Sequence, residues 1–519
     1  MARYLLVGAL GGPNFGDEII LVSWINAIRQ NDPQARIFCD GYNLNNLAGF
    51  LDGLAEVVEP SESLWNARLV AEHGQSEGIW DYLQEHSRLL DNQKGLSDCL
   101  SALRLRNFDQ VHIVGGGYFN SLWPSNYLIL LLARLLAWQT GAQLVATGLG
   151  LMPTETGNLA GLLAVLRTFD LVDVRDKESY EQLQEIEFDR LFFTGDDALL
   201  LLSDSNVRYP LQKIGDNSFI VCIQNDLFDG DSIAEAIFTS QVMTSLKLHG
   251  IWNIVFAMAM PGDVSGRAAG LVEKLKRTGF TVQSIDPDHL LKNGFPVSAG
   301  GFTVTSRYHP HLLGSLSGGR GIAISALSYY DTKHAAVRAM GSNWRILSDV
   351  EVSDTFGEAL ETELSGKSEP CRLQDRAEFI RRKKELADRL LKPKSSIYEF
   401  PFDFLSIWAQ LLWRIQQQEL QKIELKADLD GLVKQNSIIV SERDELEAHF
   451  KSGIEQIAQL KREYVELLEQ NRLASLSLID LSKEIEAAKR LNANIINSRS
   501  WKITAPLRFL SSKLRVIRH

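Results

Sequence analysis

The sequence predicts an α/β protein with two doubly wound domains, followed by a long helical coiled coil. Short β-branched runs alternate with amphipathic stretches as far as residue 350, which is typical of parallel sheets with crossover helices. Beyond residue 403, apolar residues instead recur at every seventh position. With 519 residues, the chain is longer than one hydrophobic core usually serves.

The first domain is predicted over residues 1–205 and the second over 206–350, with a helical connector at 351–403. In the first domain we expect strands at Tyr4–Ala9, Ala35–Cys39, Gln110–Val114, Gln143–Thr147, Leu171–Val174 and Leu191–Phe193. In the second we expect strands at Ser218–Gln224, Trp252–Ala257, Thr281–Ile285, Gly301–Thr305 and Gly321–Ser325.

Residues 404–497 are predicted to form a coiled coil. A single register runs from Leu425 to Ile495 over roughly ten heptads. Polar residues interrupt its companion seam, and such residues fix register and partner number. We therefore expect a homo-oligomer formed through this coiled coil. The alternative is a long solvated helix that folds back on its own domain.

The tail, residues 498–519, is predicted to form a basic amphipathic helix after Pro506. It holds arginines and lysines without any acidic residue, and apolar side chains alternate with them. This pattern fits an interfacial helix on anionic lipid, so we expect peripheral contact with the inner face of the cytoplasmic membrane. The alternatives are a docking helix for a partner protein or a frayed tail.

Charge and cysteine content exclude several classes of protein. The 54 Lys plus Arg oppose 65 Asp plus Glu, and this net charge of −11 argues against a general nucleic-acid binder. Four cysteines show no paired spacing for a zinc site or a disulfide framework, so we expect reduced thiols in a cytoplasmic protein. The longest apolar stretch, Tyr127 to Trp138, falls short of the ~20 residues that a bilayer requires.

A glycine-rich loop after the first expected strand ends in Asn14, Gly16, Asp17 and Glu18. Glycines let the backbone approach a ligand closely, and the start of the next helix offers free N–H groups. The loop has neither the dinucleotide spacing nor the Lys-Ser/Thr of a P-loop. Two carboxylates at the end of a strand favour binding of an acceptor sugar or a general base. Helix capping is the alternative.

Further polar and glycine-rich segments follow other strands. Gly115, Gly116 and Gly117 leave room for a ligand or for the opposite domain, and Arg175 lies in a charged turn. In the second domain, Arg307 offers a planar fork for carboxylate or phosphate, and His309 suits proton transfer. A surface arginine beside a satisfied histidine is the alternative. Lys333 lies in another donor-rich loop, and no metal-binding constellation appears.

In this order, the loops resemble the polysaccharide pyruvyl transferase family. The similarity covers roughly Met1 to Val350, and the combination of loops is more specific than any one of them. The residues that match or approximate the family's motifs are Asn14, Gly16, Asp17, Glu18, Gly115, Gly116, Gly117, Gly148, Gly150, Pro153, Arg175, Asp176, Ser179, Thr194, Asp196, Ala198, Arg307, His309, Tyr330, Asp331 and Lys333.

The resemblance implies two Rossmann-like domains that face each other across a cleft, as in GT-B glycosyltransferases. It also implies phosphoenolpyruvate as donor substrate, no cofactor, and a sugar or lipid-linked glycan of a surface polysaccharide as acceptor. Arg307 would pair with the donor and His309 would donate a proton. Lys333 would hold the remaining donor charge, and Asp17 would orient or deprotonate the acceptor hydroxyl.

Two other functions stay open on the sequence. One keeps the GT-B-like fold but uses a nucleotide sugar, which would make the protein a glycosyltransferase. The other is a non-catalytic organiser whose coiled coil recruits enzymes of glycan assembly.

Overall fold

The computed structural model describes most of the first 391 residues and a few short helical pieces beyond them. The described ranges are 1–72, 94–154, 159, 162–163, 165–184, 190–202, 211–215, 217–266, 270–298, 300–366, 372–391, 456, 458–459, 461–469, 483, 486–487 and 489–491. The chain divides into two compact units, Met1–Trp413 and Arg414–His519. Most of the predicted coiled coil at 404–497 and all of the tail at 498–519 lie outside the described residues. The oligomer and the membrane contact stay predictions.

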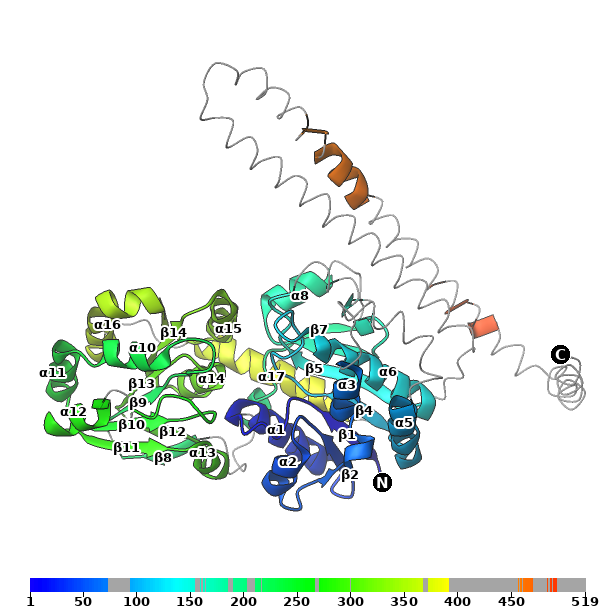
Figure 1. Cartoon of the computed structure of the whole chain (residues 1–519), viewed down its shortest axis with the longest axis horizontal. Coiled ribbons are helices and arrows are strands. Elements are labelled where there is room, and N and C mark those ends of the chain that lie inside the picture. Colours follow the sequence, from blue (N-terminus) through cyan, green and yellow to red (C-terminus); the bar gives the residue numbers. More distant parts are fainter. Residues whose placement is uncertain are drawn as a thin grey trace, which may run out of the picture. The chain divides into compact units, whose positions relative to one another are not determined.

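The first sheet is parallel and has the strand order β3-β2-β1-β4-β5-β6-β7 (Figure 1). This order reverses direction between β1 and β4, as in doubly wound sheets. The strands are β1 (Arg3–Val7), β2 (Arg36–Asp40), β3 (Glu56–Val57), β4 (Gln110–Ile113), β5 (Gln143–Leu149), β6 (Leu171–Val174) and β7 (Leu191–Phe193).

Helices cover both faces of this sheet because side chains alternate along its strands. In β1, Leu5 and Val7 pack with one group of helices, while Tyr4 and Leu6 pack with the other. The first group is α3 (Leu64–Glu72), α5 (Lys94–Arg106), α6 (Tyr127–Thr140) and α8 (Lys177–Gln184). The second group is α1 (Phe15–Asn31), α2 (Leu44–Leu51) and α9 (Leu199–Leu202). Short 3-10 helices are η1 (Pro60–Glu62) and η2 (Pro124–Asn126).

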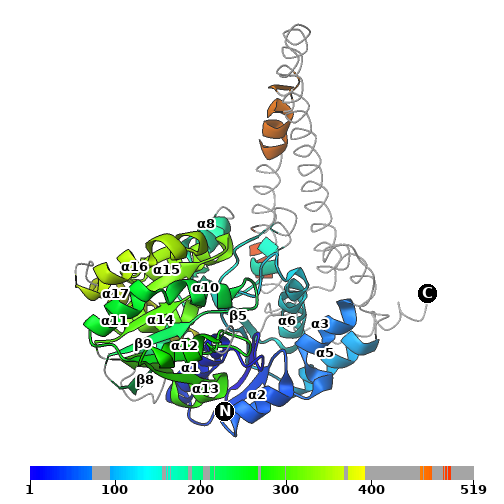
Figure 2. The ribbon, with the colours of Figure 1, turned by 60° about the vertical axis from the view of Figure 1, so that its left-hand side comes forward.

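The second sheet repeats this pattern with the order β11-β10-β9-β13-β14-β15 (Figure 1), and Figure 2 shows the second domain, in green, from another side. Its strands are β9 (Ser218–Cys222), β10 (Asn253–Ala257), β11 (Thr281–Ile285), β13 (Phe302–Thr305), β14 (Arg320–Ser325) and β15 (Arg345–Ser348). The helices on one face are α10 (Gly230–Ile237), α11 (Ser240–Leu248), α12 (Leu271–Arg277) and α16 (Asp349–Leu364). Those on the other are α13 (Pro287–Asn293), α14 (Tyr308–Leu316) and α15 (Ser328–Ala339). A separate small sheet pairs β8 (Leu211–Ile214) with β12 (Phe295–Ser298).

Helix α17 (Leu373–Leu390) connects the two domains (Figure 1). Just before it, Arg372 donates its backbone N–H to the Gly341 carbonyl at 3.0 Å, in the second domain. Just after it, the carbonyl of Leu391 accepts a hydrogen bond from Asn31 at 2.8 Å, in the first domain. The segment predicted as a connector therefore contributes α16 to one domain and α17 to both.

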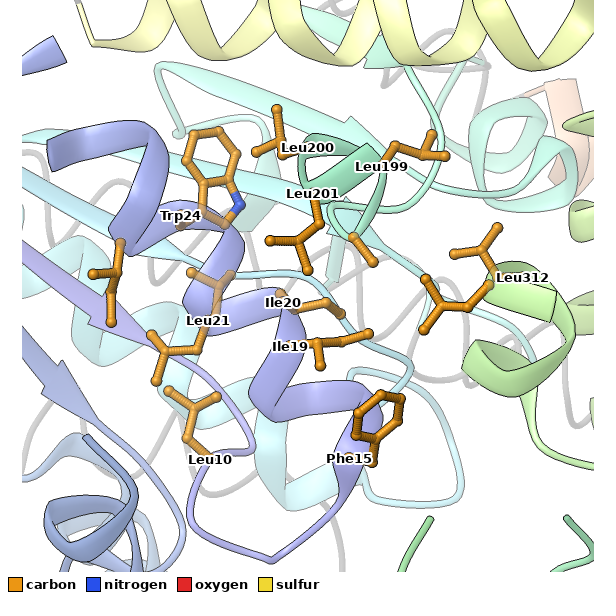
Figure 3. Packing of buried hydrophobic residues seen from close by; sticks show 14 of the residues in the cluster. Leu10, Phe15, Ile19, Ile20, Leu21, Trp24, Leu199, Leu200, Leu201 and Leu312 are labelled. Carbon is orange, nitrogen blue, oxygen red and sulfur yellow. The ribbon is translucent and has the colours of Figure 1, made fainter. Parts of the chain in front are cut away.

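One hydrophobic cluster continues from the first domain into the second. It includes Phe15, Ile19 and Trp24 of α1, the leucines of α9, and Leu312 of α14 (Figure 3). The same cluster contains residues of α17. Burial of this shared surface holds the site-bearing ends of the two domains together.

The α/β class and the parallel sheets are confirmed, and every predicted strand is present with shifts of at most two residues at its ends. Four strands were not predicted: β3, β8, β12 and β15. They are short and partly exposed, so they lack the apolar run that marks a central strand. Within the described ranges, no helix combines the length and apolar composition needed to cross a bilayer.

Candidate active site

The candidate site lies where each sheet reverses its strand order. Such switch points bind ligands in open α/β sheets, beyond the carboxyl ends of the strands. In the first domain, the loops after β1 and β4 meet there, and in the second, the loops after β9 and β13. The backbone N–H of Phe15, in the first domain, donates to the Ala259 carbonyl, in the second, at 2.8 Å. This hydrogen bond joins the two domains beside the site.

Asn14 is the N-cap of α1 and orients Asp17. Its side-chain oxygen accepts from the Gly16 amide at 3.1 Å, and its side-chain nitrogen donates to Asp17 Oδ2 at 2.7 Å. Burial raises the pKa of the half-buried Asp17, although His309, Lys333 and Arg175 oppose this rise. Asp17 is thus a carboxylate at the helix start with three cationic or ionisable groups around it.

Glu18 turns away from this group of residues. Its Oε1 accepts a hydrogen bond from the Gly11 amide at 2.6 Å, and the residue is 1% exposed. Burial raises the pKa of Glu18 to about 8, which the Gly11 hydrogen bond only partly offsets. The side chain therefore stabilises the glycine loop from inside. It does not reach the position expected of a substrate ligand.

His309, at the start of α14, lies between elements of the first domain. A Cβ atom added to Gly16 would lie only 1.9 Å from His309 Nδ1, so the absence of a side chain there makes room for the imidazole. On its other side, His309 Nε2 lies 3.4 Å from Asp196 Oδ1, and both side chains are buried. The structure thus assembles an imidazole–carboxylate pair from the two domains.

Asp196 is held in its charged form. Burial alone would raise its pKa, but His309, Arg175 and the Ala198 amide together hold that pKa well below its usual range. The Ala198 amide donates to Asp196 Oδ1 at 2.9 Å, and Arg175 Nη1 lies 3.4 Å from Oδ2. A fixed negative charge therefore faces Nε2 of His309 at 3.4 Å.

Arg175 occupies a space that two glycines leave open. A Cβ atom at Gly117 would lie 2.6 Å from its Nη2, and one at Gly150 would lie 2.6 Å from its Nε. The guanidinium also covers the ring of Tyr308 at 4.4 Å from the centroid. The glycines after β4 and β5 therefore admit a cation to the site.

Gly115 and Gly116 shape the loop instead. The Gly115 amide donates to Asp197 Oδ2 at 3.1 Å. Gly116 has a φ of 147° and exchanges backbone hydrogen bonds with Gly148 and Gly150. A substituted residue at 116 would also meet the Tyr118 ring at 2.4 Å. Of the three glycines, Gly117 alone faces both Arg175 and Lys333.

Lys333 reaches Gly117 from the second domain. Its Nζ lies 3.8 Å from the centroid of the Tyr329 ring and 5.0 Å from that of Tyr330. Burial, with Arg175 and Arg307 nearby, lowers the pKa of Lys333 well below its usual value, although Asp17 opposes this. Within the described part of the chain, no carboxylate forms an ion pair with Lys333. An anionic ligand would supply the missing charge.

Arg307 has carboxylate partners of its own. Its Nε donates to both oxygens of Asp263 at 3.2 Å, and its Nη1 donates to Asp226 Oδ2 at 3.4 Å. The side chain is 12% exposed. Its fork is thus engaged by two aspartates, and a donor would have to share or displace them. Of the predicted residues, the structure brings Asp17, Arg175, His309 and Lys333 together, with Arg307 beside them.

Sequence reasoning missed a buried ionic network beneath the glycine loops. Lys383 of α17 donates to Asp173 Oδ2 at 2.6 Å and to Asp197 Oδ1 at 2.8 Å, and all three side chains are fully buried. Asp197 also accepts from Thr147 at 2.7 Å. Asp173 lies in β6 and Asp197 in the turn before α9, and neither was singled out from the sequence. Lys383 lies in a charge-rich helix, so nothing local distinguishes it.

The fold and the site define the class: a two-domain α/β protein with an acid–base pair and two cations at the switch points of its sheets. Residues 14–249 match the sequence model of the family described as polysaccharide pyruvyl transferase. This match confirms the family resemblance that the motifs indicated. The match ends before Arg307, His309 and Lys333, yet His309 contacts Gly16 and Asp196, which both lie inside it.

Among solved structures, similar chains include sugar-nucleotide enzymes. A putative UDP-N-acetylglucosamine 2-epimerase from Listeria monocytogenes has 13% identity and a TM-score of 0.44, covering 76% of this chain and 99% of its own. The UDP-GlcNAc 2-epimerase from Methanocaldococcus jannaschii has 12% identity and a TM-score of 0.44, with 75% and 99% covered. A UDP-glucosyltransferase from Polygonum tinctorium has 11% identity and a TM-score of 0.40, with 80% and 98% covered. No protein with a curated description matches the sequence.

Proposed function

We propose that this chain transfers a pyruvyl group from phosphoenolpyruvate to a sugar of a bacterial surface polysaccharide or its lipid-linked precursor, forming a ketal. The observation that carries the proposal is the His309–Asp196 pair, 3.4 Å apart, beside Arg175 and Lys333. The match of residues 14–249 to the pyruvyl transferase family supports this choice of reaction.

The donor is an anion with a carboxylate and a phosphate, and we assign both to the cations at Gly117. Arg175 presents a guanidinium suited to either group, while Lys333 lies against two aromatic rings without an ion-pair partner in the described chain. Binding of the donor would favour the charged form of Lys333. Arg307 would be a third cation for the donor. It would release Asp226, the more exposed of its two aspartate partners, and bind the donor instead.

The proposed reaction begins with a proton added to the donor's methylene carbon, C3, which leaves an oxocarbenium-like centre at C2. One acceptor hydroxyl adds to C2 and loses its proton, the bond from C2 to the phosphate oxygen breaks, and a second hydroxyl closes the ketal with loss of its own proton. One of these two protons replaces that given to C3, and the other leaves on the phosphate.

We assign the first proton transfer to His309. Asp196 faces Nε2, so Nδ1, on the side of Gly16, is the nitrogen left for the substrate. Asp17 is our candidate for the acceptor side, because burial raises its pKa and a carboxylate of raised pKa is a better base. Asn14 fixes its orientation.

The test is phosphate release from phosphoenolpyruvate by the purified full chain, with a panel of lipid-linked and soluble sugars. We expect His309→Asn to lower kcat by about 10²–10⁴-fold and Asp196→Asn to lower it less. Lys333→Met should raise KM for phosphoenolpyruvate, because the donor loses a cation. Each variant has a matched control elsewhere on the surface.

His249, which lies 3.2 Å from Glu361, is the control for the His309–Asp196 pair. Lys247, which covers the rings of Trp252 and Phe280, is the control for Lys333. His249→Asn and Lys247→Met should leave turnover unchanged. Undiminished phosphate release by His309→Asn, or turnover of a nucleotide sugar in place of phosphoenolpyruvate, would contradict the proposal.

A further inference from the structure

The loop between Gly117 and α6 presents two large apolar side chains to solvent. Leu122 is 47% exposed and Trp123 is 39% exposed. The loop itself is firmly anchored, because the buried Asn120 donates to the Gly117 carbonyl at 2.9 Å and accepts from the Leu122 amide at 3.0 Å. The Trp123 amide donates to the Asn120 carbonyl at 3.1 Å. The indole is thus held at the surface by ordered backbone.

This indole lies at the edge of the candidate site. Its ring centroid is 6.1 Å from that of Tyr329, at an interplanar angle of 69°. The Tyr329 hydroxyl donates to the Gly117 carbonyl at 3.0 Å, and Lys333 Nζ covers the same tyrosine ring at 3.8 Å. A single aromatic ring therefore separates Trp123 from the cation that we assign to the donor.

We propose that Trp123 is the platform for the acceptor sugar, on which a pyranose ring stacks with its C–H face. This inference rests on the proposed function, because the acceptor must lie beside the donor. A pyranose has an apolar face and a polar edge, which fit an exposed indole next to charged groups. An acyl chain in the same place would cover Lys333, which has no ion-pair partner in the described chain, with hydrocarbon.

The test measures saccharide binding without any donor. Methyl β-D-glucopyranoside, methyl β-D-galactopyranoside and methyl α-D-mannopyranoside are titrated into the full chain, with saturation-transfer difference NMR as readout. We expect Trp123→Ala to raise Kd for the bound glycosides about tenfold and Trp123→Phe to change it by less than about threefold, since Phe keeps an aromatic face. Trp252, 47% exposed and distant from these contacts, is the matched control, and Trp252→Ala should have no effect.

Turnover separates this inference from the proposed function. In the presence of phosphoenolpyruvate, Trp123→Ala should raise KM for the acceptor with little change in kcat or in donor binding. If the wild type releases phosphate but Trp123→Ala leaves KM for the acceptor unchanged, the function stands and the platform is overturned. If phosphoenolpyruvate does not bind while glycosides still bind through Trp123, the function fails and the platform stands.

A third measurement tests a lipid contact. Vesicles of phosphatidylglycerol and phosphatidylethanolamine are sedimented with the wild type and with Trp123→Ala. We expect equal sedimentation of the two. Weaker sedimentation of the variant, together with unchanged glycoside binding, would assign Trp123 to the membrane and overturn the inference.

Discussion

At the scale of single residues, Glu18 makes stability depend on pH. Folding raises its pKa from 4.5 to about 8 because the carboxyl is buried, so between these values the folded chain holds a proton that the unfolded chain lacks. The free energy of unfolding therefore falls as the pH rises between these two values. Glu18→Gln keeps an acceptor for the Gly11 amide and removes the charge. We expect it to raise the free energy of unfolding by up to about 1.4 kcal/mol per pH unit across this window.

Denaturant unfolding at about pH 5 and about pH 8 measures this difference, which should be small at the lower value and large at the higher. Glu235, an exposed glutamate of α10, provides the control, and Glu235→Gln should show no such trend. Glu18→Ala should destabilise the chain, since the Gly11 amide then loses its partner. Equal stabilisation by Glu18→Gln at both pH values would show that Glu18 is charged in the folded chain.

The sequence predicted residues whose chemistry is visible locally, and missed their distant partners. Arg307 and His309 stand out because they are two residues apart at the end of a strand. Asp196 appeared only within a turn motif, since its contact with His309 forms across two domains. The engagement of Arg307 by Asp263 was not foreseen either, because these two residues of the second domain lie 44 positions apart in the sequence. Arg307 was expected to pair with the donor. Contacts between residues that are far apart in the sequence become visible only in the folded structure.

At the scale of elements, α14 and α15 are joined by two fully buried histidines, His311 and His334. Their Nδ1 atoms lie 3.0 Å apart. His334 Nε2 lies 3.1 Å from the Ile324 carbonyl, which can only accept, so that nitrogen carries the proton. His311 Nδ1 must then donate to His334, and His311 Nε2 accepts from Ser342 at 2.9 Å. One chain of hydrogen bonds fixes both tautomers and both helices.

This pair predicts loss of stability in mild acid. Burial lowers the pKa of His334 to about 4 and that of His311 well below its ordinary value, with Arg338 and Lys333 adding to the effect and Asp331 opposing it. The unfolded chain binds these protons near pH ~6.5, so the stabilisation is complete above that value and is lost as pH falls through about 4. The double variant His311→Asn/His334→Gln should show a shallower fall.

Urea denaturation between about pH 7 and about pH 4 measures that slope. The double variant is expected to be less stable at neutral pH, because two buried rings are lost, so the comparison concerns slope alone. His249→Asn removes an exposed histidine and should leave the slope unchanged. An equally steep fall in the double variant would mean that other groups carry the acid dependence.

Strands were easier to predict than their neighbours in the sheet. The central strands are largely apolar on both faces, as burial between two helix layers requires, so short runs such as Ser218–Cys222 identify them. Strand order follows from packing and crossover geometry, which single runs do not encode. The short exposed strands at the sheet edges, such as β3, carry too little pattern to detect.

At the scale of the whole molecule, α17 stabilises the two-domain unit through a charge. Lys383 is fully buried and pairs with Asp173 and Asp197, which in turn hold the Gly148 and Gly115 amides of the site loops. The sequence predicted only a helical connector here, because a lysine in a charge-rich helix reads as solvated. The contacts with Asp173 of β6 and with Asp197 of the turn before α9 make this one lysine different from its neighbours.

Removal of this lysine should therefore destabilise the fold far more than its position in a connector suggests. Lys383→Ala leaves two carboxylates buried beside each other without a counter-charge, and loss of one partner of a buried pair typically costs about 3–5 kcal/mol. Lys384→Ala removes the adjacent exposed lysine and should change stability by less than about 0.5 kcal/mol. Thermal and denaturant unfolding of the full chain compare the two.

Two shortened chains test whether the whole of α17, and not only Lys383, stabilises the two domains. A chain that ends at Trp413 keeps the whole first compact unit and should retain both its melting temperature and its response to phosphoenolpyruvate. A chain that ends at Gly366 lacks α17, exposes the apolar residues that α17 covers, and should unfold at lower temperature without that response. If the Gly366 chain melts like the Trp413 chain, α17 is a connector after all, and the domains are held together by α1, α9 and α14 alone.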